Sequence, residues 1–370
     1  MGTSEILLSL TAIILMLSGF LFMYKIPLCF AKKEKATLPS IAIIIPARNE
    51  EKNISFLLDS IKRQGLKVNE LIVVNDASTD KTKEISLGKG AFVIDSEALP
   101  KDWLGKPWAC YQGANYAKSD VLIFLDADVW FELDGLQKIV DTYSHLSNNF
   151  KEEIILSVAP FHKVKKFYED FSAIFNLIML GSMNAFTPFS KKKVSGLFGQ
   201  SLILSRKAYF SVDGHKKVKN RILENMYLAK IFREKKMKLI CLGGKGTISF
   251  RMYPNGLLEL INGWSKAYAS GATQTAFSTL FNIILWISGG FLISILFVNS
   301  IIVQKNVVLW LAIYLSFAIQ VFHFLRKIGS FKIVTSVFYP IHLIFFCLIF
   351  IRSIYLKAFN KKINWKMREV

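Results

Sequence analysis

The chain has 370 residues, 52% of them hydrophobic, and a formal net charge of +20 at pH 7. Its mean hydropathy of +0.36 is too high for an ordinary water-soluble enzyme, so membrane-embedded segments are expected. The basic excess indicates an anionic partner, and because many lysines flank apolar stretches we expect membrane lipids rather than nucleic acid. The cysteines lie far apart without a CxxC motif, which favours free thiols in a reducing compartment.

The first apolar segment, residues 6–24, is long enough to cross a bilayer. No Lys or Arg precedes it and no small-residue cleavage site follows it, so residues 1–24 are predicted to form an uncleaved anchor. A basic cluster follows the segment: Lys25, Lys32, Lys33 and Lys35. By the positive-inside rule, this cluster predicts that the large middle region is cytoplasmic.

The middle region, residues 38–270, alternates short β-branched runs with amphipathic stretches. This pattern is typical of βαβ units and predicts an α/β domain with a mostly parallel, Rossmann-like sheet. A helix is predicted at residues 54–61, where apolar residues recur at spacings of three and four. Strands are predicted at residues 41–45, ended by Pro46, and at residues 71–74, 91–94 and 121–125.

Three apolar stretches follow, at residues 280–303, 307–325 and 333–356, and a basic tail ends the chain at residues 357–370. Residues 280–356 are therefore predicted to be a C-terminal transmembrane region, in a multi-pass protein of the cell membrane. Four crossings with a cytoplasmic middle region would place the basic tail outside, against the positive-inside rule. Either the last stretch, interrupted by Pro340, is re-entrant, or the rule is violated here.

Asp126 and Asp128 carry the strongest chemical signal in the sequence. They flank Ala127 directly after the predicted strand at residues 121–125. Ligands bind at the carboxyl ends of parallel strands, and two carboxylates there can hold Mg²⁺ or Mn²⁺ that bridges to the phosphates of a substrate.

Polar residues also follow the first two predicted strands. Arg48 can pair with a phosphate or with a neighbouring glutamate such as Glu50. Asp76 can accept hydrogen bonds from a base or a ribose. For Asp80, capping of the next helix is at least as good an interpretation as substrate binding.

Lys106 follows Gly105 at the predicted start of a helix. A compact positive charge at a helix N-terminus, with close backbone approach at the glycine, suits a phosphate group. Taken alone, the same lysine is better explained as a solvated residue of a loop.

Together these segments resemble the family 2 glycosyltransferases of GT-A fold, at residues 43–51, 75–80, 105–110, 126–128 and 224–228. Within that family the sequence is most similar to the diaponeurosporenoate glycosyltransferases of carotenoid biosynthesis, and the likeness covers nearly the whole chain. The matching segments are residues 47–51, 105–106, 109–113, 167–169, 171–177, 250–253 and 263–266.

The resemblance implies a metal-dependent hexosyltransferase with a GT-A catalytic domain that uses a sugar nucleotide, UDP-glucose. Asp76 would hold the base or ribose, Asp126 and Asp128 the Mg²⁺ or Mn²⁺, and Lys106 the diphosphate. The acceptor would attack the anomeric carbon from the opposite face and invert it. Other residues expected to bind substrate are Pro46, Ala47, Arg48, Glu50, Gln200, His215, Trp264 and Lys266.

The acceptor side departs from the family pattern. Members often carry Glu-Asp at the start of a helix, with the Asp as general base, whereas this chain has Glu224-Asn225. Asn cannot take a proton, but a carboxylic acid, with a pKa near ~4, is already ionised at neutral pH and needs no base. The pair therefore fits a carotenoid carboxylate as acceptor and a glycosyl ester as product.

Three alternatives stay open. Glu224 is the base for a hydroxyl of another lipid acceptor, or it is only a helix-terminus residue that pairs with a nearby Lys or Arg. The third is a non-enzymatic polytopic membrane protein with a nucleotide-binding domain.

Overall fold

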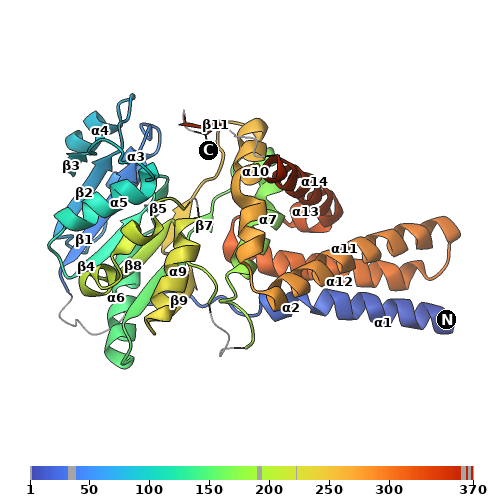
Figure 1. Cartoon of the computed structure of the whole chain (residues 1–370). Coiled ribbons are helices and arrows are strands. Elements are labelled where there is room, and N and C mark those ends of the chain that lie inside the picture. Colours follow the sequence, from blue (N-terminus) through green and yellow to red (C-terminus); the bar gives the residue numbers. More distant parts are fainter. Residues whose placement is uncertain are drawn as a thin grey trace. The chain divides into compact units, whose positions relative to one another are not determined.

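The computed structural model describes residues 2–31, 39–189, 194–221, 223–359, 364–365 and 368–369. The chain divides into two compact units, whose elements are labelled in Figure 1. The first, here called the sheet unit, comprises residues 27–162 and 196–251. The second, the helical unit, comprises residues 1–26, 163–195 and 252–370.

The sheet unit is built on a seven-stranded sheet of order β3-β2-β1-β4-β8-β6-β9. Neighbours are parallel from β3 to β4 and between β6 and β9, whereas β8 is antiparallel to both β4 and β6. The strands are β1 Ile41–Ala47, β2 Glu70–Asn75, β3 Phe92–Asp95, β4 Val121–Leu125, β6 Ile154–Ala159, β8 Ser201–Ser205 and β9 Lys238–Gly243. A second sheet joins β5 Val129–Phe131, β10 Ile248–Phe250 and β7 Phe161–His162. The predicted α/β fold with a mostly parallel sheet is confirmed.

Helices flank the large sheet (Figure 1): α3 Ile54–Lys62, α4 Thr82–Gly88, α5 Gly105–Tyr116, α6 Gly135–Asn149, α8 Arg206–Phe210, η2 Gly214–Val218 and α9 Glu224–Glu234. Helix α5 packs on β1 and β2 with Gly113 against the sheet. A Cβ atom at Gly113 would lie 2.5 Å from Cγ2 of Ile44 and 3.0 Å from Cγ2 of Val74. The glycine therefore sets how closely α5 approaches the strands, and with it the position of Lys106 in the first turn.

The predicted strands and the helix at residues 54–61 are found, and β4 has the predicted bounds. The expectation that Pro46 ends the first strand is wrong, because β1 continues through Pro46 to Ala47. Pro46 lies opposite Val74 of β2, but the ladder between β1 and β4 ends at the pair of Ile44 with Phe124. The missing N–H of proline therefore removes no hydrogen bond between β1 and β4.

The helical unit contains α1 Thr3–Leu17, α2 Gly19–Phe22, η1 Phe167–Ser172, α7 Ala173–Ser182, α10 Leu257–Gln274, α11 Phe277–Val303, α12 Val307–Ile328, α13 Ile333–Val337 and α14 Tyr339–Ala358. The two short strands β11 Asn364–Trp365 and β12 Arg368–Glu369 pair in antiparallel fashion. Within the described part of the chain, four segments are long and apolar enough to cross a membrane: Thr3–Phe22, Phe277–Val303, Val307–Ile328 and Tyr339–Ala358. The chain is therefore a membrane-associated protein, as its composition predicts.

Pro340 lies in the first turn of α14 and does not interrupt a helix. A proline is tolerated there because the first N–H groups of a helix have no partner within the helix. The apolar stretch at residues 333–356 divides at Phe338, so that α14 alone has the length of a span. Part of the charge pattern used for topology (Lys32, Lys33, Lys35, Lys361, Lys362 and Lys366) lies outside the described residues.

Residues 163–195 and 252–270 group with the apolar helices, whereas the sequence places them in the domain at residues 38–270. The reason is local packing within the helical unit. Trp264 of α10 stacks on Phe175 of α7 with 4.9 Å between ring centroids, and its Nε1–H donates to Oγ of Ser172 at 3.1 Å. These aromatic contacts bind α7 and α10 to each other.

Candidate active site

Asp126 and Asp128 lie in a tight turn that directly follows β4. The N–H of Val129 donates to the carbonyl of Asp126 at 3.4 Å, and the N–H of Asp126 donates to the carbonyl of Gln200 at 3.2 Å. Ala127 between them is buried, whereas both aspartates are half-buried. The turn thus places two half-buried carboxylates at the carboxyl end of β4, and Gln200, which precedes β8, holds the backbone there.

Lys106 joins this turn to the start of α9. Its Nζ lies 2.7 Å from Oδ1 of Asp126 and 3.2 Å from Oε1 of Glu224. The same Glu224 oxygen accepts a hydrogen bond from Nδ2 of Asn225 at 2.9 Å. Glu224 and Asn225 are 6% and 7% exposed, so this carboxylate is nearly withdrawn from water. One ammonium group therefore connects the expected donor side with the expected acceptor side.

The carboxylates determine the charge state of this lysine. Burial disfavours the charged form, but the negative charges of Asp126 and Glu224 outweigh it and raise the pKa of Lys106 well above its usual range. Lys106 is therefore a permanent cation at the edge of the sheet.

Gly199 completes the contact between these elements. Its carbonyl accepts a hydrogen bond from Nζ of Lys106 at 3.3 Å. A Cβ atom at this position would lie 2.5 Å from Nδ2 of Asn225 and 3.4 Å from Nζ of Lys106. Sequence reasoning missed Gly199, because no motif marks a glycine whose role is to admit side chains from distant parts of the chain.

The loops after β1 and β2 are fastened to each other at the same edge. Nη1 of Arg48 donates to the carbonyl of Asp76 at 2.8 Å, and the N–H of Asp76 donates to the carbonyl of Ala47 at 2.8 Å. Asn49 and Ala77 adopt left-handed conformations with φ of 51° and 49°. Left-handed backbone at non-glycine residues is costly and is concentrated at functional sites. Arg48 therefore supports the loop that carries Asp76.

The remaining polar residues of these loops have local partners. Glu50 is buried, accepts from Nδ2 of Asn53 at 2.8 Å, and donates its N–H to Oγ1 of Thr82 at 2.7 Å. Asp80 accepts from the N–H groups of Thr82 and Glu51 at 3.0 and 3.1 Å. Asp80 thus binds the first N–H of α4 from the position before the N-cap, Lys81, and Pro46 and Glu50 lie in the same hydrogen-bonded segment.

His215 is buried beneath α5. The backbone N–H of His215 donates to the hydroxyl of Tyr209 at 3.1 Å, and that hydroxyl lies 3.0 Å from Nδ1 of the imidazole ring. The Tyr209 hydroxyl therefore holds both the backbone and the ring of His215. Burial lowers the pKa of His215 to about 3, and the charge of Lys106 acts in the same direction. The structure therefore places His215 as a neutral ring supporting the site.

The structure brings Pro46, Ala47, Arg48, Glu50, Asp76, Lys106, Asp126, Asp128, Gln200, His215 and Glu224 into the sheet unit. Trp264 and Lys266 belong to α10 of the helical unit. Trp264 is only 5% exposed and its indole N–H is used by Ser172. In the helical unit, its observed contacts are those of a packing residue.

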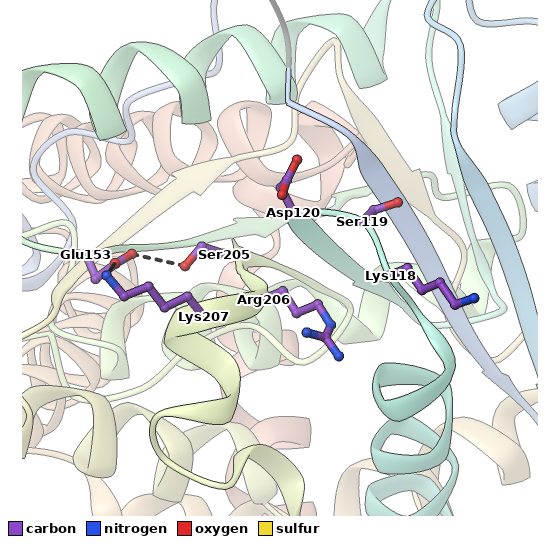
Figure 2. Close-up of a pocket in the computed structure, with 7 residues that line it drawn as sticks. All are labelled: Lys118, Ser119, Asp120, Glu153, Ser205, Arg206 and Lys207. Carbon is purple, nitrogen blue, oxygen red and sulfur yellow. Dashed lines mark hydrogen bonds and ion pairs between the residues drawn. The ribbon is translucent and has the colours of Figure 1, made fainter.

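A cavity of about 410 Å³ lies at the opposite edge of the sheet (Figure 2). Its lining comes from the segment before β4, the start of β6 and the end of β8, and consists of Lys118, Ser119, Asp120, Glu153, Ser205, Arg206 and Lys207. Figure 2 shows Glu153 linked to Ser205 and Lys207, at 3.0 and 3.9 Å. None of the expected site residues lines it, and ligands of such sheets bind at the carboxyl ends of the strands. The candidate active site is therefore the edge that carries Asp126.

Comparisons with known proteins identify the family of this chain. Residues 42–150, which include β1 through β4 and the aspartate turn, match Glycosyl transferase family 2. A 4,4'-diaponeurosporenoate glycosyltransferase from Staphylococcus aureus is 34% identical over 339 residues, 89% of this chain and 88% of the relative. This chain belongs to glycosyltransferase family 2. The non-enzymatic alternative is therefore dropped, and the protein is a glycosyltransferase with a GT-A catalytic domain.

Two further similarities extend along the chain. The 4,4'-diaponeurosporenoate glycosyltransferase of Staphylococcus haemolyticus is 35% identical over 348 residues, 91% of this chain and 90% of the relative. A mannosyltransferase from Pyrobaculum calidifontis, solved with GDP-mannose and Mn²⁺, has a TM-score of 0.55 at 15% identity and covers 96% of this chain and 99% of its own. At that identity the second similarity supports the fold alone.

Proposed function

We propose that this glycosyltransferase moves a hexose, with inversion, from UDP-glucose to the carboxylate of a carotenoid acid, and that the product is a glycosyl ester. The observation that carries the proposal is Asn225 beside Glu224 at the start of α9, next to Lys106. An amide cannot take a proton from an acceptor, and a carboxylate acceptor needs none removed. The two Staphylococcus relatives are named for transfer to 4,4'-diaponeurosporenoate, which is a carboxylate.

The donor would bind along the carboxyl ends of β1, β2 and β4, with the base or ribose at Asp76 and the diphosphate near Lys106. Asp126 and Asp128 fit a hard divalent cation, Mg²⁺ or Mn²⁺, because carboxylate oxygens are the ligands such ions prefer. The ammonium group of Lys106, 2.7 Å from Asp126, already occupies a cation's place at this carboxylate. Among the described residues there is no cluster of three or more His, Cys, Asp or Glu that could hold a metal alone. The substrate diphosphate would therefore complete the coordination.

A bound cation would stabilise the negative charge that develops on the leaving diphosphate. Lys106, at the N-terminus of α5, adds a fixed positive charge and the helix dipole on the same side. The acceptor carboxylate forms a bond to the anomeric carbon while the bond from that carbon to the diphosphate oxygen breaks, and the electron pair leaves with the nucleoside diphosphate. Glu224 holds Lys106 in place and is not required to take a proton.

A second candidate keeps the donor but transfers to a hydroxyl group, with Glu224 as general base. The observation in its favour is that the Glu224 carboxylate lies beside Lys106 at the same edge. The two candidates differ in the product, because mild alkali cleaves an ester and leaves a glycoside of an alcohol intact.

The test is to express the chain beside a C30 carotenoid pathway and treat the hexose-bearing pigment with mild alkali. For Glu224→Gln we expect a loss far below the ~10²–10⁴-fold that removal of a base causes. Glu234→Gln, at the exposed far end of α9, is the matched control. An alkali-stable product, together with a collapse of the rate in Glu224→Gln alone, would instead establish the hydroxyl mechanism.

We also propose that the four apolar helices make the protein multi-pass and that the catalytic domain, residues 38–270, faces the cytoplasm. The support is the basic residues that follow the first span, beginning at Lys25. A topology reporter fused after residue 270 should read cytoplasmic. An external signal there would reverse the orientation, and a second reporter at the C-terminus distinguishes a crossing from a re-entrant α14.

A further inference from the structure

Arg352 is a charged residue inside α14, Tyr339–Ala358, which is long and apolar enough to cross a membrane. Its guanidinium binds one face of α10, the neighbouring helix of the same unit (Figure 1). Nη1 donates to Oγ of Ser265 at 2.5 Å and to the carbonyl of Ile261 at 3.5 Å, and Nη2 donates to Oδ1 of Asn262 at 3.0 Å. Within the described part of the chain, every partner of Arg352 is a neutral oxygen.

Among the residues that the structure describes, no acidic side chain pairs with this positive charge. A charged side chain in an apolar span is costly, and such residues usually pair with an opposite charge or mark a functional site. A guanidinium carries five N–H groups, and the contacts with α10 use three of them. Two remain, which is the number that a carboxylate or phosphate engages in a bidentate contact.

The surface of α14 around Arg352 is apolar and exposed. Leu348, Ile351 and Tyr355, here called the apolar strip, are 60%, 62% and 46% exposed and occupy positions i−4, i−1 and i+3 relative to Arg352. Toward α10, in contrast, Tyr268 packs on Phe346 and Phe350, and its hydroxyl donates to the carbonyl of Phe175. Arg352 therefore lies at the border between a closed aromatic interface and an open apolar surface.

We propose that Arg352 binds the anionic head of an amphiphile, a carboxylate or a phosphate, whose apolar chain lies along the apolar strip. A polyene carboxylate and an anionic phospholipid share this chemistry, and identification of the ligand as the acceptor rests on the proposed function. The fork geometry of arginine suits either head group, whereas a lysine would supply only a point charge.

The test measures binding to full-length protein in two arms, without donor and without turnover. In the first arm the protein is reconstituted in phosphatidylcholine nanodiscs with increasing phosphatidylglycerol, and retained lipid is counted by native mass spectrometry. In the second arm an all-trans polyene carboxylate is titrated into phosphatidylcholine nanodiscs. Because neither arm needs glycosyl transfer, failure of the proposed reaction does not decide the result.

Four variants separate a ligand site from a helix clamp. Arg352→Gln keeps polar contacts to α10 but removes the charge, and should weaken binding ~10-fold or more in at least one arm. Arg352→Lys should lie in between. Ser265→Ala loosens the clamp but keeps the charge, and should bind like the wild type. Lys357→Gln, at the exposed end of the same helix, is the matched control.

A loss confined to the polyene arm assigns the site to the acceptor, and a loss confined to the phosphatidylglycerol arm assigns it to a membrane lipid. Unchanged binding in both arms for Arg352→Gln would overturn the proposal. An equal loss in Ser265→Ala and Arg352→Gln would also overturn it, because that pattern identifies Arg352 as a structural link between α10 and α14.

Discussion

Lys106 and Arg352 are both cations held by hydrogen bonds, but among the described residues only Lys106 is paired with acids. Lys106, in the sheet unit, lies between the carboxylates of Asp126 and Glu224. Arg352, in the helical unit, meets only neutral oxygens of α10. At the sheet edge the carboxylates thus outnumber the ammonium group between them, whereas at the helix pair the contacts of the guanidinium are all with neutral oxygens, and we propose that its charge is available to an anion from outside the chain.

The contrast between the two cations depends first on whether the carboxylates of the sheet edge are needed for glycosyl transfer. Asp128→Asn should reduce transfer by ~10³-fold or more, because a divalent cation supplies several kcal/mol of transition-state stabilisation. Asp120→Asn, at the amino end of the same strand, is the matched control and should retain near-normal activity. Initial rates with Mn²⁺ and Mg²⁺, on protein of verified membrane insertion, give the measurement. Full activity of Asp128→Asn in chelator would contradict the metal site.

The ion pairs of Lys106 with the two carboxylates can be removed directly with Lys106→Met. This change leaves the buried Glu224 without its cation, and we expect ~10²-fold lower activity with a loss of ~1–2 kcal/mol in stability. Breaking a fully buried ion pair costs ~3–5 kcal/mol of stability. The loss expected here is smaller because the side chain of Lys106 is 36% exposed.

The double variant Lys106→Met/Glu224→Gln should recover part of the stability without recovering the activity. The reason is that it removes the uncompensated charge together with its partner. Thermal unfolding in detergent measures the first quantity. Additive losses of stability in the double variant would show that the two residues are not coupled.

Gly199→Ala tests how tightly the network is packed. The added methyl group would displace the Asn225 amide from 2.5 Å, and ~10-fold lower activity is expected because side chains can shift to admit it. Gly88→Ala, where a Cβ atom would meet nothing within 4 Å, is the control. An effect of equal size in both variants would mean that backbone entropy, and not contact at the site, is responsible.

His215 is expected to affect the pH dependence of stability and to leave transfer activity nearly unchanged. The pKa of the ring falls from an ordinary value of 6.5 to about 3 on folding. Between these two pH values the ring is therefore neutral in the folded chain and protonated in the unfolded chain. The stability that the neutral ring contributes is fully present above pH ~6.5. It is lost as the pH falls toward ~3, by at most ~1.4 kcal/mol per pH unit. His215→Gln should therefore lose less thermal stability than the wild type between pH 7 and pH 5. An identical loss in both proteins would mean that other groups dominate.

Elements that depend on local pattern were predictable here. Strand β4 was predicted with its observed bounds, because a continuous apolar run ended by two aspartates is a local signal. Pro46 was misread because the tolerance of a proline depends on which neighbouring strand continues beside it. The grouping of residues 163–195 and 252–270 with the apolar helices was likewise not visible, since it depends on contacts such as that of Trp264 with Phe175.

The sequence by itself determined the family, the α/β fold, the apolar helices and the residue types at the sheet edge, because these follow from periodicity and from motifs of a few residues. Only the tertiary structure decided what each charge faces. Lys106, Asp126 and Glu224 come from three separate segments, and the 2.7 and 3.2 Å contacts among them exist only once α5, β4 and α9 have packed. Arg352 likewise reads in the sequence as one charge near the end of a span, and its neutral surroundings are set by the helix that packs beside it. Charge compensation is a property of distance in space, which spacing along the chain does not encode.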